Sequence, residues 1–261
     1  MAITGLRGAA LQKFEVAPLN ATSVGLHAAI TLVVTYAKTA YSATFLATAL
    51  ATDNNLRFTA GGGVAVGDIL QDAASDELVK VTSITNAPIY AVQRGYRSTA
   101  REAHLTGATW NLVGQTYALS LLASSLLGCP QPVSIKGTKA GGSLTGDVRV
   151  YGTNINGLAI YDVIALNDDA VVASVKAFKT ATSVDVPCAV TAADTVSLGV
   201  SKAIGLPVKV ASLARMLIHE FDGSTDAGAV TYDAADISKC LYTPAGTPNG
   251  SKLVALYFVS V

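Results

Sequence analysis

Residues 66–110 decide the fold of this chain, and they contain the segments VGDIL (66–70), ELVKVTSI (77–84) and AVQRGY (91–96). Turn-forming glycine and aspartate precede the apolar end of the first segment, and the apolar residues of the second are spaced among polar ones. The third strand ends at Gly95, where a positive φ costs little. We therefore expect three short strands joined by turns, which form a small β-barrel-like or hairpin module.

The motifs of this stretch follow one another in the order VGD, LVKV, VQRGY, TA, a histidine and GA. That order resembles a small β-domain that recurs in structural proteins of tailed bacteriophages. The resemblance covers about a sixth of the chain and implies a structural protein of the virion, assembled in the cytoplasm of the host bacterium. A head decoration, or cement, protein that stabilises the capsid lattice is the first interpretation. A tail-tube, neck or minor capsid protein is the alternative.

The second half of the chain, from residue 133 onward, carries many short segments rich in β-branched residues with turn formers between them. Such spacing is typical of a β-sandwich or a barrel. The segments GTN (152–154), KAFKT (176–180) and DTVSLG (194–199) also follow in an order that resembles a β-sandwich repeat of virion proteins. The chain departs from that repeat in having asparagine at the third position of GTN.

Proline and glycine residues mark the expected domain boundaries. The segment PQP (130–132) separates a β-rich domain over 26–129, which contains the module, from a β-sandwich-like domain over 130–261. Residues 1–25 carry turn formers and little periodicity, so we expect an extended N-terminal arm there. The predicted fold class is mainly β, with few short helices.

Apolar segments outside the module leave several structures open. Residues 42–50 and 119–127 are rich in alanine and leucine, which allows a short helix in each, although 119–127 could instead be a connector that packs on both domains. The segment LVALYFVSV (253–261) is predicted to be a last strand, which either closes its own sheet or pairs with the sheet of a neighbour. The apolar region 26–50 is interrupted by Lys38 and many threonines, so we expect buried β-structure or an intersubunit arm and no membrane helix.

The composition is poor in charge. Only 14% of the 261 residues are charged, against roughly 25% in ordinary soluble domains, and 18 basic residues balance 18 acidic ones. A net charge of zero provides no field that attracts nucleic acid, so no nucleic acid partner is expected. A surface with few charges indicates cover by neighbouring subunits. The expected partners are other copies of the chain, a trimer by the resemblance, and the major capsid protein or other virion proteins.

The residues that carry chemistry form no recognisable motif. The three histidines, His27, His104 and His219, lack metal-ligand spacing, and His219 has no second histidine at the HExxH position. His104 is expected to be a turn or packing residue. The glycines at 61–63 are not followed by the lysine and serine or threonine of a phosphate loop. The three cysteines are widely spaced, which favours small buried residues over disulfides or zinc ligands.

Acidic residues occur mostly at predicted turns. Asp72, Asp76 and Glu77 are expected at a solvated hairpin end, and the pair at 168–169 is expected in a hairpin-type turn. The segment 222–226 lacks the alternating acids and the distal glutamate of a calcium loop. We therefore expect no metal, no cofactor and no enzyme activity.

Two classes of function follow from these observations. The first is a non-enzymatic structural component of a phage virion. The second is a carbohydrate-binding or receptor-binding β-module, which the single tryptophan disfavours because sugar sites favour exposed aromatic platforms.

Overall fold

The structure, a computed structural model, describes residues 10–16, 32–35, 42–59, 63–119, 129–139, 144–167, 169–188, 194–209, 216–248 and 251–260. It confirms the prediction of a mainly β fold, because strands make up 58% of it and form several antiparallel sheets. Within the described ranges the helical elements are short 3-10 turns, such as η1 (Tyr96–Ser98) and η3 (Ile237–Lys239). No helix in these ranges is long and apolar enough to cross a membrane.

The short helix expected over 42–50 is wrong. Strand β3 (Ser42–Thr44) begins there, and the chain then continues in an extended form. Phe45 and Ala49 are both buried and each makes an isolated β-bridge, with Phe58 and His104 respectively, so extended backbone serves this segment better than a helix. The other helix expected, over 119–127, lies outside the described residues except for Leu119.

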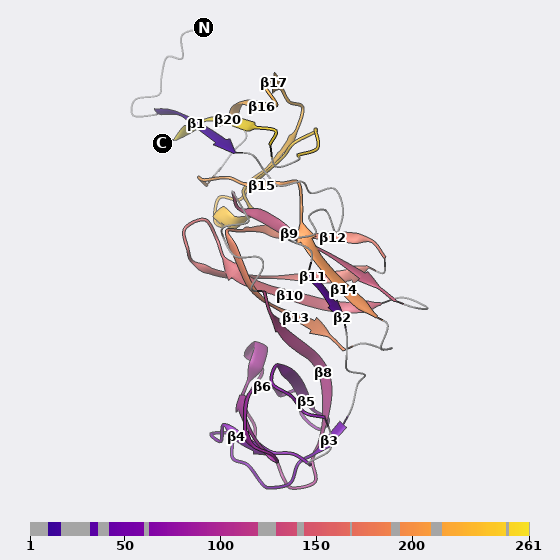
Figure 1. The fold of residues 1–261 in the computed structure, drawn as a ribbon. Helices are drawn as coiled ribbons and strands as arrows, with labels where there is room; N and C mark the ends of the chain where they lie inside the picture. Colours follow the sequence, from indigo (N-terminus) through magenta and orange to yellow (C-terminus); the bar gives the residue numbers. More distant parts are fainter. Residues whose placement is uncertain are drawn as a thin grey trace.

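The first unit of the fold is a small closed barrel, at the lower end of Figure 1. Its strands are β3, β4 (Asn55–Arg57), β5 (Asp68–Asp72), β6 (Leu78–Asn86), β7 (Ile89–Gln93) and the first part of β8 (Thr109–Ala118). They pair antiparallel in the order β3-β8-β5-β6-β7-β4, and the bridge between Phe45 and Phe58 joins the two ends. The module expected over 66–110 supplies β5, β6 and β7 of this barrel.

The barrel has an aromatic core. Residues of β7 and of the first half of β8 alternate between more and less buried positions, as strands with one face on a core must. The centroid of the Phe58 ring lies 5.8 Å from the centroids of three neighbours, Phe45, Tyr90 and Trp110. Tilted and edge-on ring pairs of this kind each add about 0.5–1.5 kcal/mol beyond the burial of their area.

Strand β8 leaves the barrel and continues into a β-sandwich, the second unit (Figure 1). One sheet contains β11 (Ala159–Asn167), β10 (Thr145–Thr153), β13 (Thr180–Pro187) and the end of β8. The other contains β12 (Val171–Phe178), β9 (Gln131–Thr138), β14 (Thr195–Val200) and β2 (Leu32–Thr35). Both sheets contribute to one apolar core, with Val148 and Val184 from the first and Ile135, Phe178 and Leu198 from the second. The predicted boundary at 130–132 lies where β9 begins.

The third unit contains the first and the last of the described strands. Its larger sheet contains β1 (Ala10–Val16), β20 (Val254–Ser260), β16 (Met216–Phe221) and β17 (Ser224–Thr225), and its smaller sheet contains β15 (Ile204–Gly205), β19 (Leu241–Thr243) and β18 (Ala229–Thr231). Strand β20 pairs with β1 on one side and β16 on the other, so the last strand closes a sheet of its own chain. Seven residues of the arm expected over 1–25 are thus part of this sheet.

Candidate functional site

Glu77 and Arg94 form an ion pair inside the barrel. Glu77 lies just before β6 and Arg94 just after β7, and the antiparallel pairing of these strands brings the two together. Nε and Nη2 of Arg94 donate to the two carboxylate oxygens of Glu77 at 2.6 and 2.7 Å, and neither side chain is exposed. The guanidinium also donates to the backbone oxygens of Leu50, Asp53 and Glu102. The pair is therefore fully bonded and structural.

The prediction that Asp72 and Glu77 lie at a solvated hairpin end is wrong, although Asp76 is exposed. Glu77 is buried because the guanidinium of Arg94 is buried beside it and compensates its charge. The sequence pattern does not reveal this pairing. His104 adds to this network: Nε2 of its ring lies 2.7 Å from Oε2 of Glu77, and Nδ1 lies 3.4 Å from Oδ2 of Asp72. The ring is buried against Trp110, so His104 packs in the barrel core.

The pKa of Glu77 shows which of these effects prevails. Burial alone raises the pKa of this carboxyl, but the hydrogen bonds from Arg94, from the backbone N–H of Glu102 and from His104 lower it to about 2. Glu77 is therefore an anion at any ordinary pH. An acid–base role at neutral pH, which needs a group that exchanges its proton near pH 7, does not suit it.

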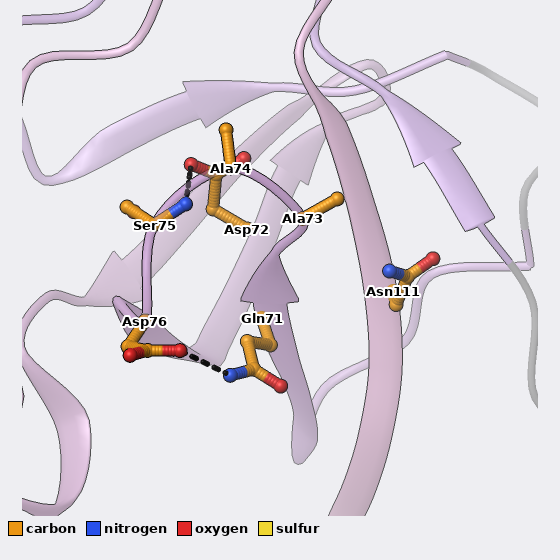
Figure 2. A pocket seen from close by; sticks show the side chains of 7 residues that line it. All are labelled: Gln71, Asp72, Ala73, Ala74, Ser75, Asp76 and Asn111. Carbon is orange, nitrogen blue, oxygen red and sulfur yellow. Dashed lines mark hydrogen bonds between the residues drawn. The ribbon is translucent and has the colours of Figure 1, made fainter.

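A pocket of about 320 Å³ lies at the turn between β5 and β6 (Figure 2). The carboxylate of Asp72 lies beside Ala74 at the top of the turn in Figure 2 and accepts the N–H of Ser75 at 3.0 Å, while Asp76 lies at the lower end of the turn and accepts from Nε2 of Gln71 at 3.4 Å. The two carboxylates do not converge on one point. Across the described residues, no group of three histidine, cysteine or acidic side chains is placed to hold a metal ion.

A second buried carboxylate, Asp185 of β13, joins the barrel to the sandwich. It accepts hydrogen bonds from the hydroxyls of Thr116, Tyr96 and Tyr151 at 2.6, 2.8 and 2.9 Å. Nε and Nη2 of Arg97 both lie 3.3 Å from the same carboxylate. Tyr96 and Arg97 belong to the η1 turn of the barrel, whereas Tyr151 lies on β10 of the sandwich. The fully buried Asp185 therefore holds the two units together at this point.

The backbone of the η1 turn is strained. Gly95 has a φ of 61°, which confirms the positive φ expected for this glycine. Arg97 and Ser98 also have positive φ, at 55° and 65°, and such residues cost on the order of 1–3 kcal/mol each. The bonds from Arg97 to Asp185 offset part of that cost, as does Thr99, whose hydroxyl accepts the N–H of Leu78 at 2.9 Å.

A larger pocket, of about 470 Å³, lies beside this joint. The η1 side contributes Gln93, Tyr96 and Arg97, and the sandwich contributes Arg149, Tyr151 and Tyr161. Burial is the main reason why the pKa of Tyr96 and that of Tyr151 are raised, so both hydroxyls remain protonated donors to Asp185. The pocket thus has a cationic and aromatic wall that the internal hydrogen bonds hold in place.

The other candidate groups from the sequence are not brought together. Asp226 uses its carboxylate to accept the hydroxyl of Tyr242 and the N–H of Ala245, so the segment 222–226 has no loop of free oxygens. His219 stacks on Tyr242. The three cysteines form no disulfide with one another; Cys129 and Cys240 are buried, and Cys188 is half-buried. His27, Asp168 and the glycines at 61–62 lie outside the described residues.

Comparisons with known proteins leave this geometry to be interpreted by itself, because no protein family model, no curated protein and no solved structure matches the chain. Sequence reasoning missed the Asp185 joint and the pocket beside it. One signal was available for the barrel network: Arg94 and His104 follow Glu77 in the motif order, and Arg94 comes directly after a predicted strand.

Proposed function

We propose that this chain is a non-enzymatic structural component of a tailed-bacteriophage virion, of the head decoration type, that stabilises the capsid lattice through contacts between subunits. In this role it is assembled in the host cytoplasm and contacts the major capsid protein or other virion proteins, with a homotrimer favoured by the resemblance. The order of motifs over 66–110 supports the class of protein. A role as a tail-tube, neck or minor capsid protein is the alternative within the same virion.

The buried polar groups of the barrel support a mechanical role. The hydrogen bonds of Glu77, Arg94 and His104 are made to one another and to the backbone. Asp185 does the same at the joint, where strand β8 also runs through both units. Fully bonded polar networks make a structure rigid and specific. A rigid barrel on a rigid sandwich is suited to transmitting load between subunits.

A patch of exposed leucines on the barrel carries the proposal. Leu46, Leu50 and Leu105 are 42%, 63% and 74% exposed. They belong to two neighbouring segments, which are joined by backbone hydrogen bonds between Phe45 and Ala108 and between Ala49 and His104. Single exposed leucines are common, but three on adjacent segments form an apolar patch of the kind that marks protein contacts. The barrel lies at the end of the molecule away from β1 and β20, where a second protein has access to it (Figure 1).

The first test is the number of copies of this chain in purified particles of the phage that encodes it, measured by quantitative mass spectrometry. Hundreds of copies per particle fit a decoration protein or a tail tube, and a dozen or fewer point to the neck or tip. Absence from the particle contradicts the proposal.

The second test places a charge in the leucine patch. Leu105→Asp is expected to abolish attachment to shells while the melting temperature stays close to that of the natural chain. Leu158→Asp is the matched control, because Leu158 is also exposed, at 63%, but lies in the sandwich. If both variants decorate shells with full occupancy, the barrel patch is not the contact surface.

A further inference from the structure

We propose that the pocket beside the Asp185 joint binds a sugar acid, with the carboxylate of the ligand on Arg149 and an apolar face of its ring on Tyr161. This inference goes beyond the virion role and does not depend on it, because it concerns a small ligand and a different surface from the leucine patch.

Arg149 is the residue that would bind the anionic group of the ligand. It lies on β10, and neither a hydrogen bond nor an ion pair joins its side chain to the described residues. Its Nε atom is buried and lacks a hydrogen-bond partner among those residues. A buried donor without a partner is unfavourable, and a guanidinium offers paired donors that match a carboxylate. A ligand carboxylate in the pocket supplies the missing acceptor.

Charge in the pocket is not balanced. Arg97 forms an ion pair with Asp185, at 3.3 Å, whereas Arg149, which lies opposite Asp185 in the pairing of β10 with β13, forms no ion pair in the described part of the chain. Two arginines thus line the pocket against one carboxylate; Lys176, whose Nζ lies 5.5 Å from the centroid of the Tyr161 ring, is paired with Asp236 at 4.0 Å. The net positive charge favours a ligand that carries a negative group.

Tyr161 supplies the aromatic surface. It lies on the edge strand β11 and is 51% exposed, although the guanidinium of Arg149 lies 5.7 Å from its ring centroid. A half-exposed ring next to a cation is suited to a small ligand that has both an apolar face and an acidic group. Tyr151 lies next to it, 6.1 Å between ring centroids, and extends the aromatic wall.

The η1 turn completes the site with neutral polar groups. Ser98, held at a positive φ, and Gln93 at the end of β7 both line the pocket and are able to hydrogen-bond with sugar hydroxyls. Strained backbone is concentrated at functional sites, where the surrounding structure enforces it. The volume of about 470 Å³ lies within the range of about 300–1,000 Å³ that is usual for small-molecule sites.

The test is a titration of the full chain with glucuronate and galacturonate, followed by calorimetry and by NMR of the tyrosine rings. Glucose, inorganic phosphate and N-acetylglutamate amide are titrated in parallel. Saturable binding of a sugar acid is expected, with much weaker binding of glucose and phosphate. Arg149→Gln is expected to weaken it about tenfold or more, because a hydrogen bond to a charged group is lost. Tyr161→Ala is expected to weaken it as well.

Arg57→Gln is the matched control, since Arg57 is an exposed arginine on β4 of the barrel, outside the pocket. Its affinity for the sugar acid is expected to equal that of the natural chain. Circular dichroism and a thermal melt check that each variant folds, and Tyr161→Ala, at an exposed position, remains a test if Arg149→Gln does not fold. The proposal is overturned by absence of saturable binding, by equal affinity for inorganic phosphate, by tighter binding of the glutamate derivative, or by unchanged affinity in both pocket variants.

Discussion

Arg94 and Glu77 are joined by two parallel hydrogen bonds, of 2.6 and 2.7 Å, in the interior of the barrel, where neither side chain reaches solvent. Removing two charges from water costs several kcal/mol per ion, and the mutual attraction offsets this only when the geometry is good and the remaining donors are bonded. Both conditions hold here, because Arg94 also bonds to three backbone oxygens. The pair is thus much more sensitive to loss of one partner than to replacement of both.

Glu77→Ala is therefore expected to lower the free energy of unfolding by about 3–5 kcal/mol, since it leaves the Arg94 charge buried without its partner. Denaturant melts measure this. Asp169→Ala is the control, because it removes an exposed ion pair with Lys136, 3.9 Å apart, and its effect is expected to stay within about 1 kcal/mol. Equal effects of the two substitutions contradict the structural role of the buried pair.

The pH dependence of stability follows from the low pKa of Glu77. This pKa falls from 4.5 to about 2 on folding, so the contribution of Glu77 is fully present above pH 4.5 and is lost as the pH falls toward 2. Glu77→Gln removes the titration while nearly keeping the size of the side chain. The difference in unfolding free energy between the natural chain and this variant is expected to be constant from pH 7 to pH 5 and to shrink below pH 4.5. A difference that does not change with pH contradicts it.

Substitutions of the residues that bond to Asp185 are expected to lower the free energy of unfolding more than a substitution of a tyrosine that does not. Tyr96→Phe and Tyr151→Phe each remove one hydrogen bond to Asp185, and each is expected to cost about 0.5–1.5 kcal/mol. Tyr161→Phe is the control, because that ring is half exposed, and its effect is expected to stay within about 0.5 kcal/mol. Thermal and denaturant melts compare the three. If all three variants match the natural chain, the joint is not held by Asp185.

The sequence predicted what depends on neighbouring residues. The three strands of the module and the turn at Gly95 agree with the prediction, and the last strand forms one of the two pairings that the sequence left open, because turn formers and β-branched runs act over a few positions. Strand β3, where a short helix was expected, does not agree. Asp185 was not foreseen, since its partners Tyr96 and Arg97 lie 89 and 88 positions away. Nothing in either segment alone indicates that a carboxylate and a strained turn meet.

Glu77 shows the other limit. An acidic residue in a stretch with two more acids and an alanine pair has the composition of a solvated turn, and Asp76 is indeed exposed. Glu77 is buried because Arg94 is buried with it, and a pattern that scores residues one at a time does not detect such a pair. Arg149 is a second example. Only its surroundings in the fold show that its buried Nε lacks a hydrogen-bond partner among the described residues.

The last prediction concerns Gly95, which precedes the η1 turn with a φ of 61°. Gly95→Val is expected to lower the free energy of unfolding by on the order of 1–3 kcal/mol from backbone strain alone. A further cost comes from contact, because a Cβ at this position lies 2.8 Å from the backbone oxygen of Thr99. Gly107→Val separates the two terms: Gly107 also has a positive φ, of 93°, but a Cβ there meets nothing within 4 Å. Denaturant melts are expected to rank Gly95→Val as the more damaging substitution, and the reverse order indicates that the turn relaxes around Thr99.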